Sequence, residues 1–208
     1  MKQEERKART IRKLLDATEQ LIAEKDCASI TMNEIMERSN LSKGAIFHHV
    51  KTKDEIFARV LMERLEETDR RFTAETELEE KTFEGPMRQI ARGFSALDDG
   101  REATNKVLAY LLGKQEDPAV KEALGRYYEQ SVRLSRQWIA SGQRHGVIPE
   151  TLDAGRAGEM FTLLSLGLRV RASLPNSPAA FTSDDFAGFI VEILQPNGKI
   201  EKRGESKP

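Results

Sequence analysis

Three hydroxyl side chains, each placed to cap a helix, divide one segment of this 208-residue chain into short helical pieces. Thr31 and Thr52 are each followed three residues later by a glutamate, which is the spacing of a capping box, and Ser42 precedes another helical pattern. Two short helices joined by a turn of three or four residues form a helix-turn-helix, whose second helix can enter the major groove of DNA. We predict a helix from 31 to about 38, a break at 39–41, a second helix opening at Ser42, and another after Lys51.

Elsewhere, apolar residues recur at three- and four-residue spacing, which is typical of amphipathic helices. Val, Ile and Thr do not alternate with polar residues over any sustained run, which argues against a β-sheet. The predicted fold class is therefore all-α, with about nine helices. Besides the two short helices, their expected bounds are about 3–25, 53–76, 87–97, 101–114, 118–145, 153–173 and 183–194.

Composition excludes a membrane protein. Hydrophobic residues make up 38% and charged residues 32% of the chain, which suits amphipathic helices with solvated outer faces. No apolar run approaches the roughly 18 residues that a membrane span needs. The charged N-terminus lacks the apolar core of a signal peptide. We therefore expect a cytoplasmic protein without a membrane partner.

Redox, metal and catalytic chemistry find little support in the sequence. Cys27 is the only cysteine, which excludes a disulfide framework and a Cys-based zinc site. We interpret it as a structural thiol, with a redox-sensing thiol as the open alternative. His48 and His49 are adjacent, so on a helix they point in different directions and do not form a metal site. Without a phosphate-binding glycine loop or a nucleophile elbow, we expect no enzyme activity and no metal or other cofactor.

The distribution of charge is more informative than the net charge of −1. Residues 1–13 carry six Lys or Arg against two Glu, and residues 1–60 carry twelve basic against ten acidic side chains. The positive excess therefore falls in the same part of the chain as the predicted helix-turn-helix, where attraction to phosphates would require it.

Three motifs follow one another with caps, glycine, aromatic residue and lysines in order: Thr31-x-x-Glu-Ile35, LSKGAIFHH at 41–49 and KTKDEIF at 51–57. With these motifs, residues 6–60 resemble the DNA-binding domain of TetR-type transcriptional regulators. Phe47 is one of the DNA-binding residues that the resemblance implies. It stands where the family most often has a tyrosine that contacts a phosphate, so we expect that hydroxyl contact to be absent and Phe47 to serve mainly in packing. Asn40 replaces the usual glycine of the turn, and asparagine tolerates the left-handed conformation.

The resemblance implies which residues bind DNA. Lys43, Ala45 and His48 would reach base edges, where a lysine can donate to guanine and an alanine can meet a thymine methyl. Phosphate contacts would position the protein without specifying the DNA sequence. They would come from Thr31, Ser42, Gly44, His49 and Lys53.

The family also implies the organisation of the chain. Residues 1–52 would be the DNA-binding domain, the helix at 53–76 a connection, residues 77–196 the ligand-binding and dimerisation domain, and 197–208 a disordered tail. Six residues could line a cavity for a small-molecule effector, although an apolar residue at helical spacing more often belongs to a core. They are Phe94, Leu108, Leu111, Tyr127, Tyr128 and Trp138.

The last two helices resemble the family's dimerisation pair. Dimer contacts are expected from Phe161, Leu164, Leu168, Phe186, Phe189 and Ile193, and also from Leu166. One recognition helix covers few base pairs, so specific binding needs two heads on an inverted repeat of double-stranded DNA. The expected function is that of a homodimeric repressor released from a palindromic operator by a small molecule. The alternative is a helical ligand-binding adaptor that has lost DNA binding.

Overall fold

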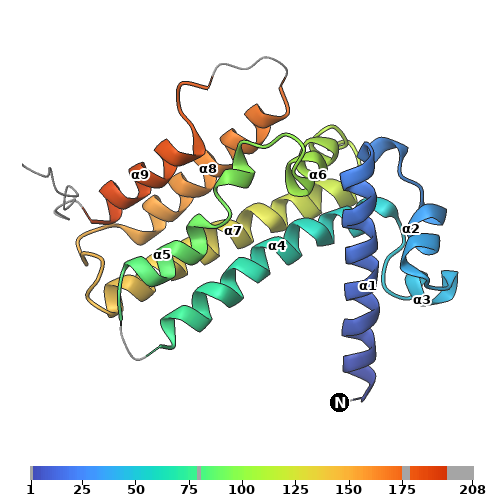
Figure 1. Ribbon diagram of the computed structural model, residues 1–208, viewed down its shortest axis with the longest axis horizontal. Coiled ribbons are helices and arrows are strands. Elements are labelled where there is room, and N and C mark those ends of the chain that lie inside the picture. The colour runs from blue at the N-terminus through green and yellow to red at the C-terminus, as the bar shows by residue number, and fades with distance from the viewer. Residues whose placement is uncertain (1, 79–80, 175–178, 196–208) are drawn as a thin grey trace, which may run out of the picture.

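The computed structural model describes residues 2–78, 81–174 and 179–195, and every regular element among them is helical (Figure 1). The predicted all-α class is confirmed. The nine α-helices of this part of the chain are α1 (Lys2–Glu24), α2 (Met32–Ser39), α3 (Lys43–Phe47), α4 (Lys53–Thr76), α5 (Glu84–Ala91), α6 (Ala103–Leu112), α7 (Pro118–Arg144), α8 (Ala154–Ala172) and α9 (Ser183–Leu194). Two short 3₁₀ helices, η1 (Cys27–Ser29) and η2 (Ser95–Leu97), complete them.

The fifth and sixth helices differ most from their predicted bounds: α5 covers Glu84–Ala91 instead of 87–97, and α6 covers Ala103–Leu112 instead of 101–114. The fifth helix ends at Ala91 because Gly93, a poor helix former, follows it, and η2 then turns the chain toward α6. The α3 helix ends at Phe47, and the N–H of His49 bonds to the carbonyl of Ile46 at 2.8 Å in a tightened last turn. The predicted disordered tail lies outside the described residues.

The head consists of α1, α2 and α3, and Figure 1 shows it at one end of the molecule, with α4 leading away from it. Its core is shared with the first half of α4 and with α6. Phe57 and Ile46 are fully buried in it, and burying a side chain of this size contributes about 1.5–3 kcal/mol. Because Val107 of α6 belongs to the same core, the head is packed against the body rather than tethered to it.

The body is built on α4, α7 and α8, with α5 against α4 and α9 against α8 (Figure 1). A second core joins α5, η2, the end of α7, α8 and α9. The α7 and α8 helices approach closely at Gly158, where an added Cβ would lie 2.9 Å from the backbone nitrogen of Arg136. Glycine is therefore required at this crossing, which fixes α7 and α8 relative to each other.

Candidate nucleic-acid interface and internal cavity

The predicted caps and turn are present around α2. The Thr31 hydroxyl accepts the N–H of Glu34 at 3.3 Å, and the Glu34 carboxylate accepts the N–H of Thr31 at 2.8 Å, which completes the capping box. The hydrogen bond from the Lys25 ammonium, followed by that from the Thr31 backbone, lowers the pKa of Glu34 to about 2. Asn40 ends the helix in the left-handed conformation, with φ of 52°. The turn before α3 is therefore as predicted.

The α3 helix presents one face to the core and the other to solvent. Ile46 and Val50, four residues apart, are 0% and 2% exposed and hold the helix against α1 and α4. Ser42 caps its start by accepting the N–H of Ala45 at 3.3 Å. The outward face carries the residues predicted to meet DNA, of which Ser42, Lys43, Gly44, Phe47 and His48 are exposed and Ala45 and His49 are half-buried.

The packing role predicted for Phe47 is wrong. Its side chain is 41% exposed, and the Lys43 ammonium lies 5.6 Å from the centre of its ring. A cation at this distance from an aromatic face is attracted to it. Phe47 therefore belongs to the exposed face of α3, where it orients the Lys43 side chain.

Gly44 is not required by the fold. A Cβ added at this position would meet no atom within 4 Å, and its backbone is in an ordinary helical conformation. The space outside Gly44 is therefore open solvent at the start of the exposed helix. This is where a phosphate could approach the backbone closely.

The end of α3 is surrounded by positive charge from other helices. The Arg59 guanidinium of α4 donates to the carbonyl oxygen of His49 at 2.9 Å. Partial burial lowers the pKa of His49, and the charges of His48, Lys7 and Arg59 lower it further. Lys7 lies on α1, so the predicted basic N-terminus does lie near the exposed helix. Arg59 had no recognisable signal in the sequence, because its partner is a backbone carbonyl.

Lys53 occupies a different place from the one predicted. Its ammonium donates to three carbonyl oxygens around η1, at 3.1 Å to Cys27, 2.9 Å to Ala28 and 2.7 Å to Ile30. An ammonium group has three donors, so none remains for a phosphate. Partial burial also lowers the pKa of Lys53. We therefore correct the predicted phosphate contact: Lys53 joins the start of α4 to the connection between α1 and α2.

The Lys53→Met variant should consequently be less stable than the wild type. Three carbonyl groups would lose a charged donor, which we expect to lower the free energy of unfolding by about 1–2 kcal/mol at this half-buried site. Urea unfolding followed by circular dichroism measures this. Lys51→Met, at an exposed lysine two residues earlier, is the matched control. Equal unfolding midpoints for the two variants would contradict the structural role.

The body contains a cavity of about 430 Å³, within the range of small-molecule sites. Of the predicted lining residues, Phe94, Tyr127 and Trp138 do line it. Leu108 and Leu111 do not, because they are buried in the core shared with the head. Tyr128 points away, and its hydroxyl donates to Glu159 of α8 at 2.9 Å. These three assignments are therefore wrong.

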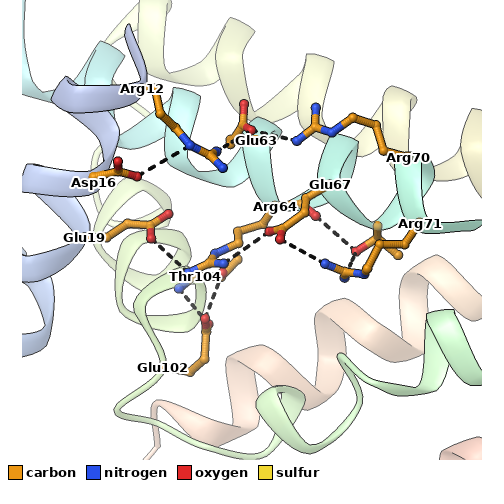
Figure 2. A network of polar contacts seen from close by, with 11 residues as sticks. Arg12, Asp16, Glu19, Glu63, Arg64, Glu67, Arg70, Arg71, Glu102 and Thr104 are labelled. Carbon is orange, nitrogen blue, oxygen red and sulfur yellow. Dashed lines mark hydrogen bonds and ion pairs between the residues drawn. The ribbon is translucent and has the colours of Figure 1, made fainter. Parts of the chain in front are cut away.

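Ion pairs connect α4, which lines the cavity, to α1 of the head, and Figure 2 shows this network. Arg64 of α4 donates to Glu19 of α1 at 2.9 Å and to Glu67, one turn later in α4, at 3.3 Å. Arg71 pairs with the same Glu67 at 3.0 Å. Arg64, Glu67 and Arg71 all line the cavity, so a group bound there would compete for contacts that reach α1.

Four of the seven predicted dimer contacts lie inside the protomer. Phe161, Leu168 and Phe186 are 7%, 4% and 0% exposed and belong to the second core, which corrects their assignment. Leu166 lines the cavity and is corrected in the same way. Leu164, Phe189 and Ile193 are half-buried. The exposed apolar residues of α8 are instead Leu163, at 54%, and Val170, at 39%.

Comparison with known proteins agrees with the geometry of the head. Residues 14–60 match the model of the tetR family of bacterial regulatory proteins. No curated protein sequence matches the chain significantly. Across the described residues, no helix is both long enough and apolar enough to cross a membrane.

Solved structures extend the likeness to the whole fold. Salmonella enterica GusR is 20% identical over 89% of this chain and 95% of that chain, with a TM-score of 0.59. A TetR-family transcriptional regulator from Mesorhizobium loti is 20% identical over 92% and 96%, with a TM-score of 0.63. SmeT, solved in complex with triclosan, is 18% identical over 88% and 90%, with a TM-score of 0.61. At these identities the likeness shows the fold.

Proposed function

We propose that this chain, a tetR-family regulatory protein with a helix-turn-helix DNA-binding head, acts as a homodimeric repressor that a small-molecule effector releases from an inverted-repeat operator. The observation that carries the proposal is the outward face of α3. There, Lys43, Gly44 and His48 are exposed around a helix that Ile46 and Val50 hold rigidly from below. Such a face can enter the major groove without rearrangement of the head.

The position of a residue on the head decides whether we expect it to contact bases or phosphates. Lys43, Ala45 and His48 lie on the exposed side of α3, where they support base contacts. The cap residue Ser42 and the open backbone at Gly44 support contacts to phosphate. Thr31 and His49 contribute at the two flanks, and Lys7 of α1 adds charge beside His49.

An apolar stripe on α8 supports dimerisation. Met160, Leu163, Gly167 and Val170 follow one another at spacings of three, four and three residues, so they share one face of the helix. Leu163, Gly167 and Val170 are exposed in the single chain. An exposed apolar stripe of this kind favours contact with a second copy of the chain. Two copies joined through this face would present two α3 helices to one inverted repeat.

The contacts between α6 and the head support regulation by an effector. The Lys106 ammonium donates to the carbonyl oxygens of Ile22 and Lys25 at the end of α1. One turn further along α6, the Tyr110 hydroxyl donates to Asp54 of α4 at 2.9 Å. The ammonium of Lys114, just after the end of α6, donates to the same carboxylate at 2.7 Å. A displacement of α6 or α4 therefore moves the head as well. A ligand that favours a different placement of these helices lowers operator affinity.

The proposal is tested by DNA binding. Using fluorescence anisotropy with DNA that flanks the gene, the Lys43→Ala variant should bind about tenfold or more weakly than the wild type, because a base-edge contact is lost. Lys121→Ala, at an exposed lysine of α7, is the control and should bind as the wild type does. A steep salt dependence is expected of all three proteins. If the wild type bound no DNA even at low salt, the adaptor alternative would be favoured.

A further inference from the structure

The charged lining of the cavity is unbalanced. Two carboxylates face four guanidinium groups among the residues that line it. The carboxylates are Glu67 and Glu102, and the guanidinium groups are Arg64, Arg71, Arg92 and Arg169. Glu19 pairs with Arg64 from outside the lining, which leaves an excess of one positive charge. Because the rest of the cavity wall is mostly apolar, this excess is the strongest electrostatic preference that a ligand would meet.

Both carboxylates already have partners. Glu67 pairs with Arg64 and Arg71. Glu102 caps α6 by accepting the backbone N–H groups of Thr104 at 2.6 Å and Asn105 at 3.2 Å, and it lies 3.8 Å from Arg169. Neither is free to bind a cationic ligand without giving up these contacts. The cavity therefore disfavours an amine.

The guanidinium groups have donors to spare. Each arginine has five N–H donors, and Arg71 uses its terminal nitrogens on Glu67 and on the Thr68 hydroxyl. Its Nε is buried and has no hydrogen-bond partner within the described part of the chain. A buried donor of a charged group that lacks an acceptor is unfavourable. An anion that draws the Arg71 side chain toward itself would supply the missing acceptor.

Aromatic and aliphatic side chains make up most of the remaining cavity wall. Lining residues of α4 run from Arg64 to Thr76, a distance of about 18 Å along the helix. Arg64 lies at the end near α6, together with Glu102 and Arg169. Two aromatic groups belong to this wall. The rings of Phe72 and Trp138 lie 5.4 Å apart between centres, and the ring of Phe186 lies 5.3 Å from that of Phe94 and 6.4 Å from that of Phe161. The cavity thus combines cationic side chains with a large aromatic wall.

From this arrangement we infer that the effector is an amphipathic organic anion, with its acidic group at Arg64, Arg71 and Arg169 and its apolar body against the aromatic wall. The inference rests on the proposed function for the role of the cavity. Arginine is suited to this task because its planar donors match the two oxygens of a carboxylate. The apolar body gains most of its binding free energy from burial against the aromatic wall.

Three probes with the same ten-carbon chain test the inference: decanoate, 1-decanol and decylammonium. Trp138 is the only tryptophan of the chain and lines the cavity, so its emission in the full-length protein reports occupancy, with calorimetry as a second readout. We expect decanoate to bind most tightly and decylammonium most weakly. Arg71→Gln should weaken decanoate binding about tenfold or more and leave 1-decanol unchanged.

The matched control is Arg70→Gln. Arg70 is adjacent on α4 and pairs with Glu63 at 2.8 Å outside the cavity, so its removal should change neither affinity. The inference is overturned if decylammonium binds as tightly as decanoate, if Arg71→Gln leaves decanoate binding unchanged, or if no probe binds. Because none of these readouts involves DNA, the repressor proposal stands or fails separately in the anisotropy measurement.

Discussion

The Gly44→Met variant is expected to lose specific operator binding while folding as stably as the wild type. A side chain at this position meets no atom of the protein within 4 Å, and methionine has a higher helix propensity than glycine. The same side chain would stand between the backbone of α3 and the DNA. Because the whole helix would be held out of the groove, we expect affinity to fall toward the non-specific level, by about a hundredfold or more.

A second open glycine provides the control. Gly125 of α7 also has no atom within 4 Å of an added Cβ, and it lies on the exposed side of the body. Gly125→Met should therefore match the wild type both in anisotropy and in thermal unfolding. A Gly44→Met protein that still bound the operator at wild-type affinity would show that α3 does not approach DNA at its first turn.

Local chemistry explains why the head could be predicted from the sequence. A cap depends on a hydroxyl and a backbone N–H three residues apart, as at Thr31 and Ser42. The turn at Asn40 depends only on the tolerance of asparagine for positive φ. The buried side of α3 follows from the four-residue spacing of Ile46 and Val50. None of these features depends on which distant part of the chain packs against them.

The assignments that were wrong depend on distant contacts. The partners of Lys53 are carbonyl groups 23 to 26 residues earlier, and backbone carbonyls leave no mark in the sequence. Leu108 and Leu111 do lie on an apolar stripe, but the stripe packs against the head and not around the cavity. Helical spacing indicates that a side chain is buried and does not indicate which core buries it.

The cavity illustrates the same limit. Trp138 was predicted as a lining residue because it combines apolar area with a polar group, and its indole N–H donates to Asp69 of α4 at 2.8 Å. The charged residues that line the cavity were not predicted. Arg64 and Arg71 lie on a helix whose sequence alternates acidic and basic residues, which is typical of a solvated face. Only the packing of α4 against α7 turns one side of it inward.

On α8 the apolar residues occur nearly all round, so spacing alone could not separate the core from the interface. The structure separates them: Phe161 and Leu168 pack inward, whereas Leu163 and Val170 face solvent. We therefore expect Leu163→Glu to give a folded protein that sediments as a single 23.5 kDa chain and not as a dimer. Joining two copies would bury two unpaired carboxylates near the symmetry axis, which is strongly unfavourable.

Operator binding should fail together with dimerisation. Two linked heads bind an inverted repeat far more tightly than one, so a monomer is expected to lose about a hundredfold or more in affinity. Leu78→Glu is the matched control, because Leu78 is also 54% exposed but lies just after α4, away from the α8 stripe. Sedimentation and anisotropy on both variants separate the effect of the interface from that of adding a charge. If Leu163→Glu remained dimeric and bound the operator normally, the two heads would have to be joined through another surface, and the exposed stripe on α8 would need a different partner.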